Sequence, residues 1–209
     1  HITVWNQAQR VHSYAGKPAG DYVVTMTGTF SAFSFASVTT SRLKLKTINQ
    51  WGTNLFTTLS FAGASNIQYL PAGLYAAGAL TQCWQSCNLT AAKIDPSLFS
   101  NSSGVTSIAG CFLGNPLGTI PLGLLYPLVN LQNAGDAFDA CGLTSIHVDT
   151  FRYNTQLTNM GTAVGGQGML GRNNLTSIPA DLFKYNTLVT SFSSTFRSNP
   201  ITSIPVDLF

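Results

Sequence analysis

The chain has 209 residues, of which 8% are charged, well below the quarter that is usual for soluble domains. The net charge of +3 is too small to favour nucleic-acid binding, and every acidic residue is an aspartate. No apolar run reaches the roughly 18 residues of a membrane-spanning helix, and the many aliphatic and aromatic residues exclude a disordered composition. The chain opens on His1 inside a strand-like pattern without a signal peptide, which indicates an excised or processed piece of a longer chain.

Residues 1–40 are predicted to form a small antiparallel β region. Apolar and polar side chains alternate at residues 2–4 and again at 21–27, and glycines bound the second run. Such alternation is typical of half-buried strands. Together with Trp5, the runs 12–14 and 18–28 resemble the second half of a PKD-type immunoglobulin-like domain. The resemblance implies an extracellular β-sandwich spacer, whole or partial.

Residues 41–66 are predicted to join this region to the rest of the chain and to end in a degenerate first repeat or cap. Arg42, Lys44 and Lys46 alternate with leucines, so a strand would place all three cations on one face. That face would be solvated or would protect a sheet edge. The alternative is a small patch for an acidic glycan or a phosphate.

Residues 67–209 contain a repeated phrase. Residues 175–183 read LTSIPADLF and residues 201–209 read ITSIPVDLF, so the two copies lie 26 residues apart. That spacing falls in the range of stacked repeat proteins. Weaker copies bring the number to six, the last of them cut short. Their repeat isoleucine or leucine is Leu70, Ile94, Ile120, Ile146, Ile178 and Ile204.

A second pattern lies between the phrases. Val189, Phe192 and Phe196 follow one another at steps of three and four residues, and four earlier copies show similar steps. This spacing predicts an apolar stripe along two helical turns. A repeat of this size cannot bury its apolar side alone, so each copy is predicted to stack on its neighbours.

An asparagine or cysteine stands two residues before the leading apolar residue of each later phrase, and a large apolar residue stands three positions earlier. The first column is Cys87, Asn115, Cys141, Asn173 and Asn199, and the second is Trp84, Phe112, Phe138, Leu170 and Phe196. This order resembles the leucine-rich repeats, in particular the BspA-like branch of bacterial, protozoan and phage-borne surface proteins. The resemblance covers about residues 45–209 and implies a leucine-rich-repeat solenoid of short strands and short helical turns.

The strand of each repeat is expected at the Leu-x-x-Ile segment, as in residues 175–178, with a helical turn beginning near Asp181. In a different leucine-rich branch the strand would precede the Asn/Cys position, near residues 192–196. Leu175, Ile178, Leu182, Phe192 and Phe196 are all expected to be buried, with the repeat isoleucines stacked in one column.

Few residues suggest a catalytic or nucleotide-binding site. Gly166, Gly168 and Gly171 match G-x-G-x-x-G, but a dinucleotide site needs a strand before the motif and a helix after it. The motif lies inside the long copy between Met160 and Asn174, which predicts a loop. His147 lies two residues from both Ser145 and Asp149, yet all three occupy ordinary repeat positions. A catalytic set is therefore not predicted.

Asp149, Asp181 and Asp207 share one column, three residues after the repeat isoleucine. An aspartate in the first turn of a helix meets the backbone N–H groups favourably, so capping is the preferred interpretation and a calcium site the alternative. The four cysteines lack zinc spacing, and two of them occupy the Asn/Cys column. Buried free thiols are predicted, with a Cys87–Cys111 disulfide as the alternative.

The sequence thus predicts no enzyme, no cofactor and no metal site. It predicts an extracellular or cell-surface recognition module that binds a protein or glycan, as part of a larger polypeptide or fibre, without nucleic-acid binding or membrane insertion. The alternative is a structural spacer or a receptor-binding part of a phage tail fibre or virion. Candidate binding residues form an aromatic–basic row and a hydroxyl row: Arg152, Tyr153, Lys184, Tyr185, Thr144, Ser145, Thr176 and Ser177.

Overall fold

The computed structural model describes residues 18, 20–26, 28–35, 38–161 and 168–209. The chain divides into two compact units, His1–Phe30 and Ser31–Phe209. In the first unit, residues 21–26 form no strand and are all exposed. The prediction of a half-buried strand at residues 21–27 is therefore wrong for these six, because no buried face lies beside them. The remaining PKD-like positions, at residues 1–17, 19 and 27, lie outside the described residues.

Regular elements in the second unit are short. The strands are β1 (Ala32–Ser34), β2 (Thr58–Ser60), β3 (Ala77–Ala79) and β4 (Gly104–Ser107), and the 3-10 helices are η2 (Arg42–Lys44), η3 (Ala91–Lys93) and η4 (Val148–Phe151). β1 pairs with β2 and β3 with β4, both in parallel. β1 was expected inside an antiparallel region, yet it belongs to the second unit and pairs in parallel. No helix of the described residues is long and apolar enough to cross a membrane.

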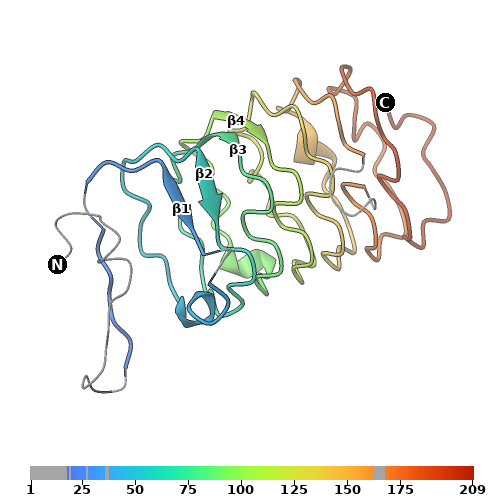
Figure 1. Cartoon of the computed structure of the whole chain (residues 1–209). Helices are drawn as coiled ribbons and strands as arrows, with labels where there is room; N and C mark the ends of the chain where they lie inside the picture. The colour runs from blue at the N-terminus through green and yellow to red at the C-terminus, as the bar shows by residue number, and fades with distance from the viewer. Residues whose placement is uncertain (1–17, 19, 27, 36–37, 162–167) are drawn as a thin grey trace. The chain divides into compact units, whose positions relative to one another are not determined.

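Successive coils of the second unit lie side by side, which Figure 1 shows from green to red. Parallel bridges join the equivalent residues Ser107, Asn133, Asn159 and Ser191 of four consecutive coils. The spacing between bridged residues is 26, 26 and then 32, so the coil that follows Asn159 is six residues longer than the two before it.

The bridges correct the expected position of the strand. Residues 143–146 and 175–178 contain no strand, and the bridged residue instead precedes the large apolar residue of each coil, such as Phe112, Phe138 or Leu170. Segment 143–146 touches its neighbour through separate bonds, such as Thr144 N–H to Gly118 O at 3.1 Å. The earlier coils do carry one bridge in the expected segment, between Leu70 and Ile94.

The segment around the phenylalanines is not helical. Phe112 N–H donates to Ala137 O and Gly114 N–H donates to Asp139 O, at 3.0 and 2.9 Å, so alternate amides bond to the next coil as they do in a sheet. Left-handed residues interrupt this extended path, for example Asp136 at φ 55°. The expectation of two helical turns is therefore wrong, because every second amide bonds to the next coil, while those between them, such as Cys111 and Leu113, close separate three-residue turns.

A column of aromatic rings forms part of the core. Phe61 stacks on Trp84, Trp84 on Phe112 and Phe112 on Phe138, with centroids 6.5, 5.5 and 5.5 Å apart and planes within 16°. The last three are fully buried. The sequence pattern of one large residue per repeat is thus, from Phe61 to Phe138, a stack with one ring contributed by each of four coils, and Leu170 follows it in the next coil.

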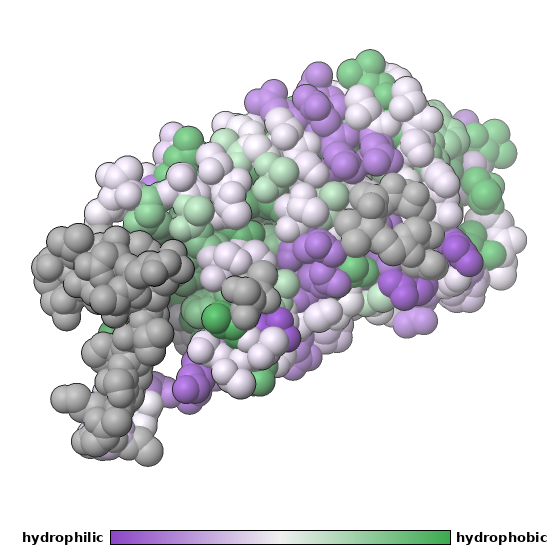
Figure 2. All heavy atoms as spheres, in the orientation of Figure 1, coloured by the Kyte–Doolittle hydropathy of each residue, from purple (hydrophilic) through white to green (hydrophobic). Residues whose placement is uncertain are grey.

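Burial follows the predicted columns until the last coil. Leu175, Ile178 and Leu182 are buried as expected. Phe192 and Phe196 are only half-buried, and Ile204 is 69% exposed, unlike the earlier repeat isoleucines. These residues lie in the last coil, and among the described residues another coil packs against only one side of it. Figure 2 shows hydrophobic residues gathered at this end of the molecule.

Candidate ligand-binding surface

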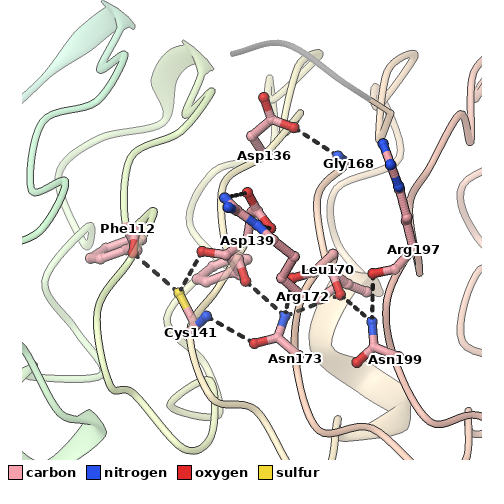
Figure 3. Close-up of polar contacts among 12 residues, drawn as sticks. Phe112, Asp136, Asp139, Cys141, Gly168, Leu170, Arg172, Asn173, Arg197 and Asn199 are labelled. Atoms are coloured by element: carbon pink, nitrogen blue, oxygen red, sulfur yellow. Dashed lines mark hydrogen bonds and ion pairs between the residues drawn. The ribbon is translucent and has the colours of Figure 1, made fainter. Parts of the chain in front are cut away.

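The Asn/Cys column is a buried ladder that links neighbouring coils (Figure 3). Asn173 Oδ1 accepts from the backbone N–H groups of Cys141 and Leu143 at 2.9 and 3.0 Å. Its Nδ2 donates to Phe138 O and Leu170 O, both at 3.0 Å. Asn115 repeats the pattern two coils earlier with Cys87 and Leu89. The column therefore satisfies buried backbone groups and holds no open binding position.

The cysteines of this ladder act as hydrogen-bond donors. The Cys141 thiol lies 3.1 Å from Phe112 O, and the Cys87 thiol lies 3.0 Å from Phe61 O. All four cysteines are free and buried, so the Cys87–Cys111 disulfide is not formed. Burial raises the pKa of Cys87 to about 11 and that of Cys141 to about 12. Protonated, buried thiols of this kind are poor nucleophiles.

Two aspartates that the repeat pattern did not single out are buried beside the longer coil (Figure 3). Asp139 makes a two-pronged ion pair with Arg172, at 3.0 Å to Nε and 2.5 Å to Nη2. Asp136 Oδ1 accepts from Gly168 N–H at 2.8 Å. Their columns hold unrelated residue types in the other coils, so the only sequence signal is two aspartates flanking a core phenylalanine. Both aspartates thus bind the segment 168–172, where the longer coil comes back beside the coil before it.

Gly168 itself packs against the next coil. A β-carbon at this position would lie 2.2 Å from Ser194 O, and the φ of 79° is left-handed. Only glycine fits such an approach. Gly171 is buried, whereas Gly166 lies outside the described residues. The described part of the G-x-G-x-x-G run thus serves the contact between coils.

His147 and the aspartate column make local contacts. His147 precedes η4, and its Nδ1 accepts from Asp149 N–H at 3.1 Å, which is a helix-capping bond. Asp149 pairs with Arg152 at 3.2 Å, and Asp181 pairs with Lys184 at 3.6 Å. Within the described residues, no three His, Cys, Asp or Glu side chains are grouped to hold a metal ion.

The predicted cationic strand at residues 42–46 is a different element. Residues Arg42–Lys44 form the 3-10 helix η2, so the three cations do not share a strand face. Arg42 is half-buried, and its Nη1 donates to Ala62 O at 3.2 Å. Arg42, which was predicted to bind an anionic ligand, instead hydrogen-bonds to the loop that contains Ala62.

An exposed edge band crosses the coils instead. Its members follow the buried residues Leu74, Phe99, Leu125, Phe151 and Phe183, which stand at equivalent places in five coils. The edge band is defined as Tyr75, Ser100, Asn101, Tyr126, Arg152, Tyr153, Lys184 and Tyr185. Four of these are the aromatic–basic residues expected from the sequence. Tyr75 and Tyr126 were missed, although each directly follows a buried leucine just as Arg152 follows a phenylalanine.

The rings of the edge band pack on one another and on a cation. The guanidinium carbon of Arg152 lies 5.9 Å from the centre of the Tyr153 ring and 5.4 Å from that of Tyr185. Tyr126 meets Tyr153 edge to face, with centroids 4.7 Å apart. Tyr153 and Tyr185 nevertheless remain 47% and 43% exposed. The structure therefore brings these residues together while leaving ring surface open to a ligand.

Both cations of the edge band already have partners. Arg152 hydrogen-bonds to Asp149, which raises the pKa of the guanidinium, and Lys184 pairs with Asp181. The net charge of these two pairs is zero. The edge band is thus aromatic and polar, without an excess of positive charge.

A shallow groove of about 450 Å³ lies at the Tyr75 end of the edge band. It is lined by Tyr75, Ser100 and Asn101 of the edge band together with Gly52, Thr53 and Ser103. The second predicted row, Thr144, Ser145, Thr176 and Ser177, is exposed throughout. None of these four residues lines the groove beside Tyr75.

Comparisons with protein-family profiles and with curated proteins gave no match to this chain.

Proposed function

We propose that residues 67–209 form a leucine-rich-repeat solenoid that acts as a non-enzymatic recognition module at a cell surface. The edge band is its binding site for a cell-surface protein or glycan. The observation that carries this proposal is Arg152, held between Tyr153 and Tyr185 of neighbouring coils with much of both rings exposed. Tyrosine and arginine are the residue types that binding surfaces favour.

Two further features support the proposal. The Asn/Cys ladder recurs from coil to coil, and aromatic rings stack across several of the coils, which supports an assembly of stacked repeats. The buried acids and thiols are bonded within the fold, so the groups with reactive chemistry are committed to structure. What remains open to a partner is an extended surface, which is how stacked repeats bind.

The test is attachment of the purified chain to cells and to a glycan panel. A variant with Arg152, Tyr153, Lys184 and Tyr185 all changed to alanine should bind much more weakly and melt close to the parent. The matched control changes Tyr69 and Lys44, which are exposed and lie outside the edge band, to alanine. This control should bind as the parent does.

Undiminished binding by the fourfold variant would remove the edge band from the site. If the unmutated chain attached to no cell and no glycan, the result would favour the alternative role as a spacer in a surface fibre or virion.

A further inference from the structure

Resting on the proposed function, we propose that the edge band binds a neutral oligosaccharide, with one sugar seated in the groove beside Tyr75 and others against Tyr126 and Tyr153. The proposal narrows the ligand from any surface partner to one chemical class. It rests on the charge, the lining and the layout of the edge band.

The charge of the edge band favours neutral glycans over acidic ones. An acidic sugar is favoured by an excess of positive charge, but Arg152 lies 3.2 Å from the Asp149 carboxylate and Lys184 lies 3.6 Å from that of Asp181, so the two pairs carry no net charge. Drawing either cation to a ligand carboxylate would leave an aspartate unpaired. A neutral ligand requires no such exchange.

The residues that line the groove can make the two kinds of contact that a sugar forms, packing on an aromatic ring and hydrogen bonds. A pyranose ring has an apolar face that packs on an aromatic ring and hydroxyl groups around its rim. Tyr75 supplies a ring that is 43% exposed, and the serine, threonine and asparagine side chains supply both donors and acceptors. Asn101 Nδ2 donates to Gly73 O at 3.3 Å, which orients the amide at the rim.

The same lining disfavours a protein partner. Protein interfaces concentrate their binding energy in large side chains that enter desolvated pockets. The groove is shallow, and among the residues that line it Tyr75 is the one large apolar side chain. This groove thus offers no deep apolar pocket to an anchoring residue.

The layout suits a chain of sugars. Tyr75, Ser100, Tyr126, Arg152 and Lys184 each directly follow the equivalent buried residue of successive coils. Neighbouring coils that pair in parallel lie about 4.8 Å apart. Tyr75 and Tyr126 belong to this column, and Tyr153 and Tyr185 belong to the column that follows it. The tyrosines are therefore presented along a band that crosses the coils and not around a single cavity, and a linear oligosaccharide meets several of them in turn.

The experiment measures binding of neutral, sulfated and sialylated oligosaccharides by isothermal titration at low and high salt. The parent should bind neutral oligosaccharides with an affinity that changes less than about twofold between 0.05 and 0.5 M salt, because uncharged contacts are not screened. Tyr75→Ala and Tyr153→Ala should each weaken binding by about five- to tenfold, since each removes a stacking ring. Tyr75→Phe should retain most of it.

A gain-of-function variant sharpens the result. Asp149→Asn with Asp181→Asn would leave Arg152 and Lys184 unpaired, and it should acquire salt-sensitive binding to sulfated glycans while keeping the neutral ligand. Melting curves verify that each variant is folded. The Tyr69→Ala and Lys44→Ala control should match the parent.

Other outcomes are distinguishable. Salt-sensitive preference of the parent for acidic glycans would overturn this inference and leave the proposed recognition function standing. So would cell attachment that protease treatment of the cells abolishes and glycosidase treatment does not. If the parent bound neither cells nor any glycan, the inference and the proposed function would fail together.

Discussion

Phe112 and Phe138 lie face to face with centroids 5.5 Å apart and no exposed surface, whereas Tyr126 and Tyr153 meet edge to face at 4.7 Å beside solvent. In both places neighbouring coils contribute one ring each. The surroundings differ, because Asn173 of the interior satisfies backbone groups of two coils while Arg152 of the edge band pairs with a carboxylate three residues away. The same repeat spacing thus builds a stabilising column inside and a displayed column outside.

The largest expected difference is between the two aromatic columns. Phe138→Ala should lower the free energy of unfolding by about 3–5 kcal/mol, because it opens a cavity in a stacked core. Tyr153→Ala should cost less than about 1 kcal/mol, as exposed substitutions usually do. Urea unfolding of the two variants measures both. Equal losses would mean that the edge band is a structural column and not a displayed one.

The second largest loss of stability is expected in the Asn/Cys ladder. Asn173→Ala should cost about 3 kcal/mol, because the N–H groups of Cys141 and Leu143 and two carbonyl groups lose their buried partner. Cys141→Ala should cost about 1–2 kcal/mol, since a thiol donates a weak bond. The same unfolding assay compares them, and a smaller loss for Asn173→Ala would contradict the assigned role of the ladder.

Alkaline pH should weaken the interior through its buried thiols. The pKa of Cys87 is raised from its ordinary value of 9.0 to about 11, so the folded chain holds this proton more tightly than the unfolded chain. The contribution is complete below pH 9 and is lost as pH rises towards 11. By pH 10.5 the loss should be about 2 kcal/mol for this thiol. Unfolding at pH 8 and 10.5 should show a smaller difference in Cys87→Ala than in the parent.

The fourfold alanine variant of Arg152, Tyr153, Lys184 and Tyr185 should lower the free energy of unfolding by no more than about 1–2 kcal/mol, because these side chains are exposed. The measurement is a melt of the same samples used for the attachment assay. A larger loss would show that the inter-coil contacts of Arg152 with the rings stabilise the fold, and the binding data would then need a milder variant.

The smallest effect is expected at the end of η4. His147→Ala removes the bond from Asp149 N–H to Nδ1, which is a partly exposed cap, and should cost about 1 kcal/mol or less. Binding of the neutral oligosaccharide should be unchanged, since His147 is outside the edge band. Weaker binding in a fully folded sample would extend the site to this residue.

The sequence was most informative where one residue type recurs at every copy. The Asn/Cys column and the large residue before it predicted the buried ladder and the stacked rings, because both depend on spacing alone. The strand position was wrong because both halves of the repeat form backbone bonds to neighbouring coils, and spacing does not reveal which half contains most of the parallel bridges. The two helical turns were wrong for a related reason, since left-handed residues such as Asp136 bring side chains three and seven positions apart to one face without a helix.

The candidate site was only partly predictable. Arg152, Tyr153, Lys184 and Tyr185 stood out because two adjacent copies carry the same pair of residue types. Tyr75 and Tyr126 did not, because the early copies diverge in sequence and their shared place becomes visible only when the buried residue before each is known. Asp139 and Arg172 were missed because they lie 33 residues apart and occur in one coil pair alone.

The longer coil after Asn159 also has a practical meaning. It holds six residues more than its predecessor, yet the bridge to Ser191 and the bonds of Asn173 resume in register beyond it. The Asp136–Gly168 and Asp139–Arg172 contacts fix the chain where this longer segment ends. Peptides of other lengths should therefore be graftable between Met160 and Gly168 while the neighbouring coils keep their alignment.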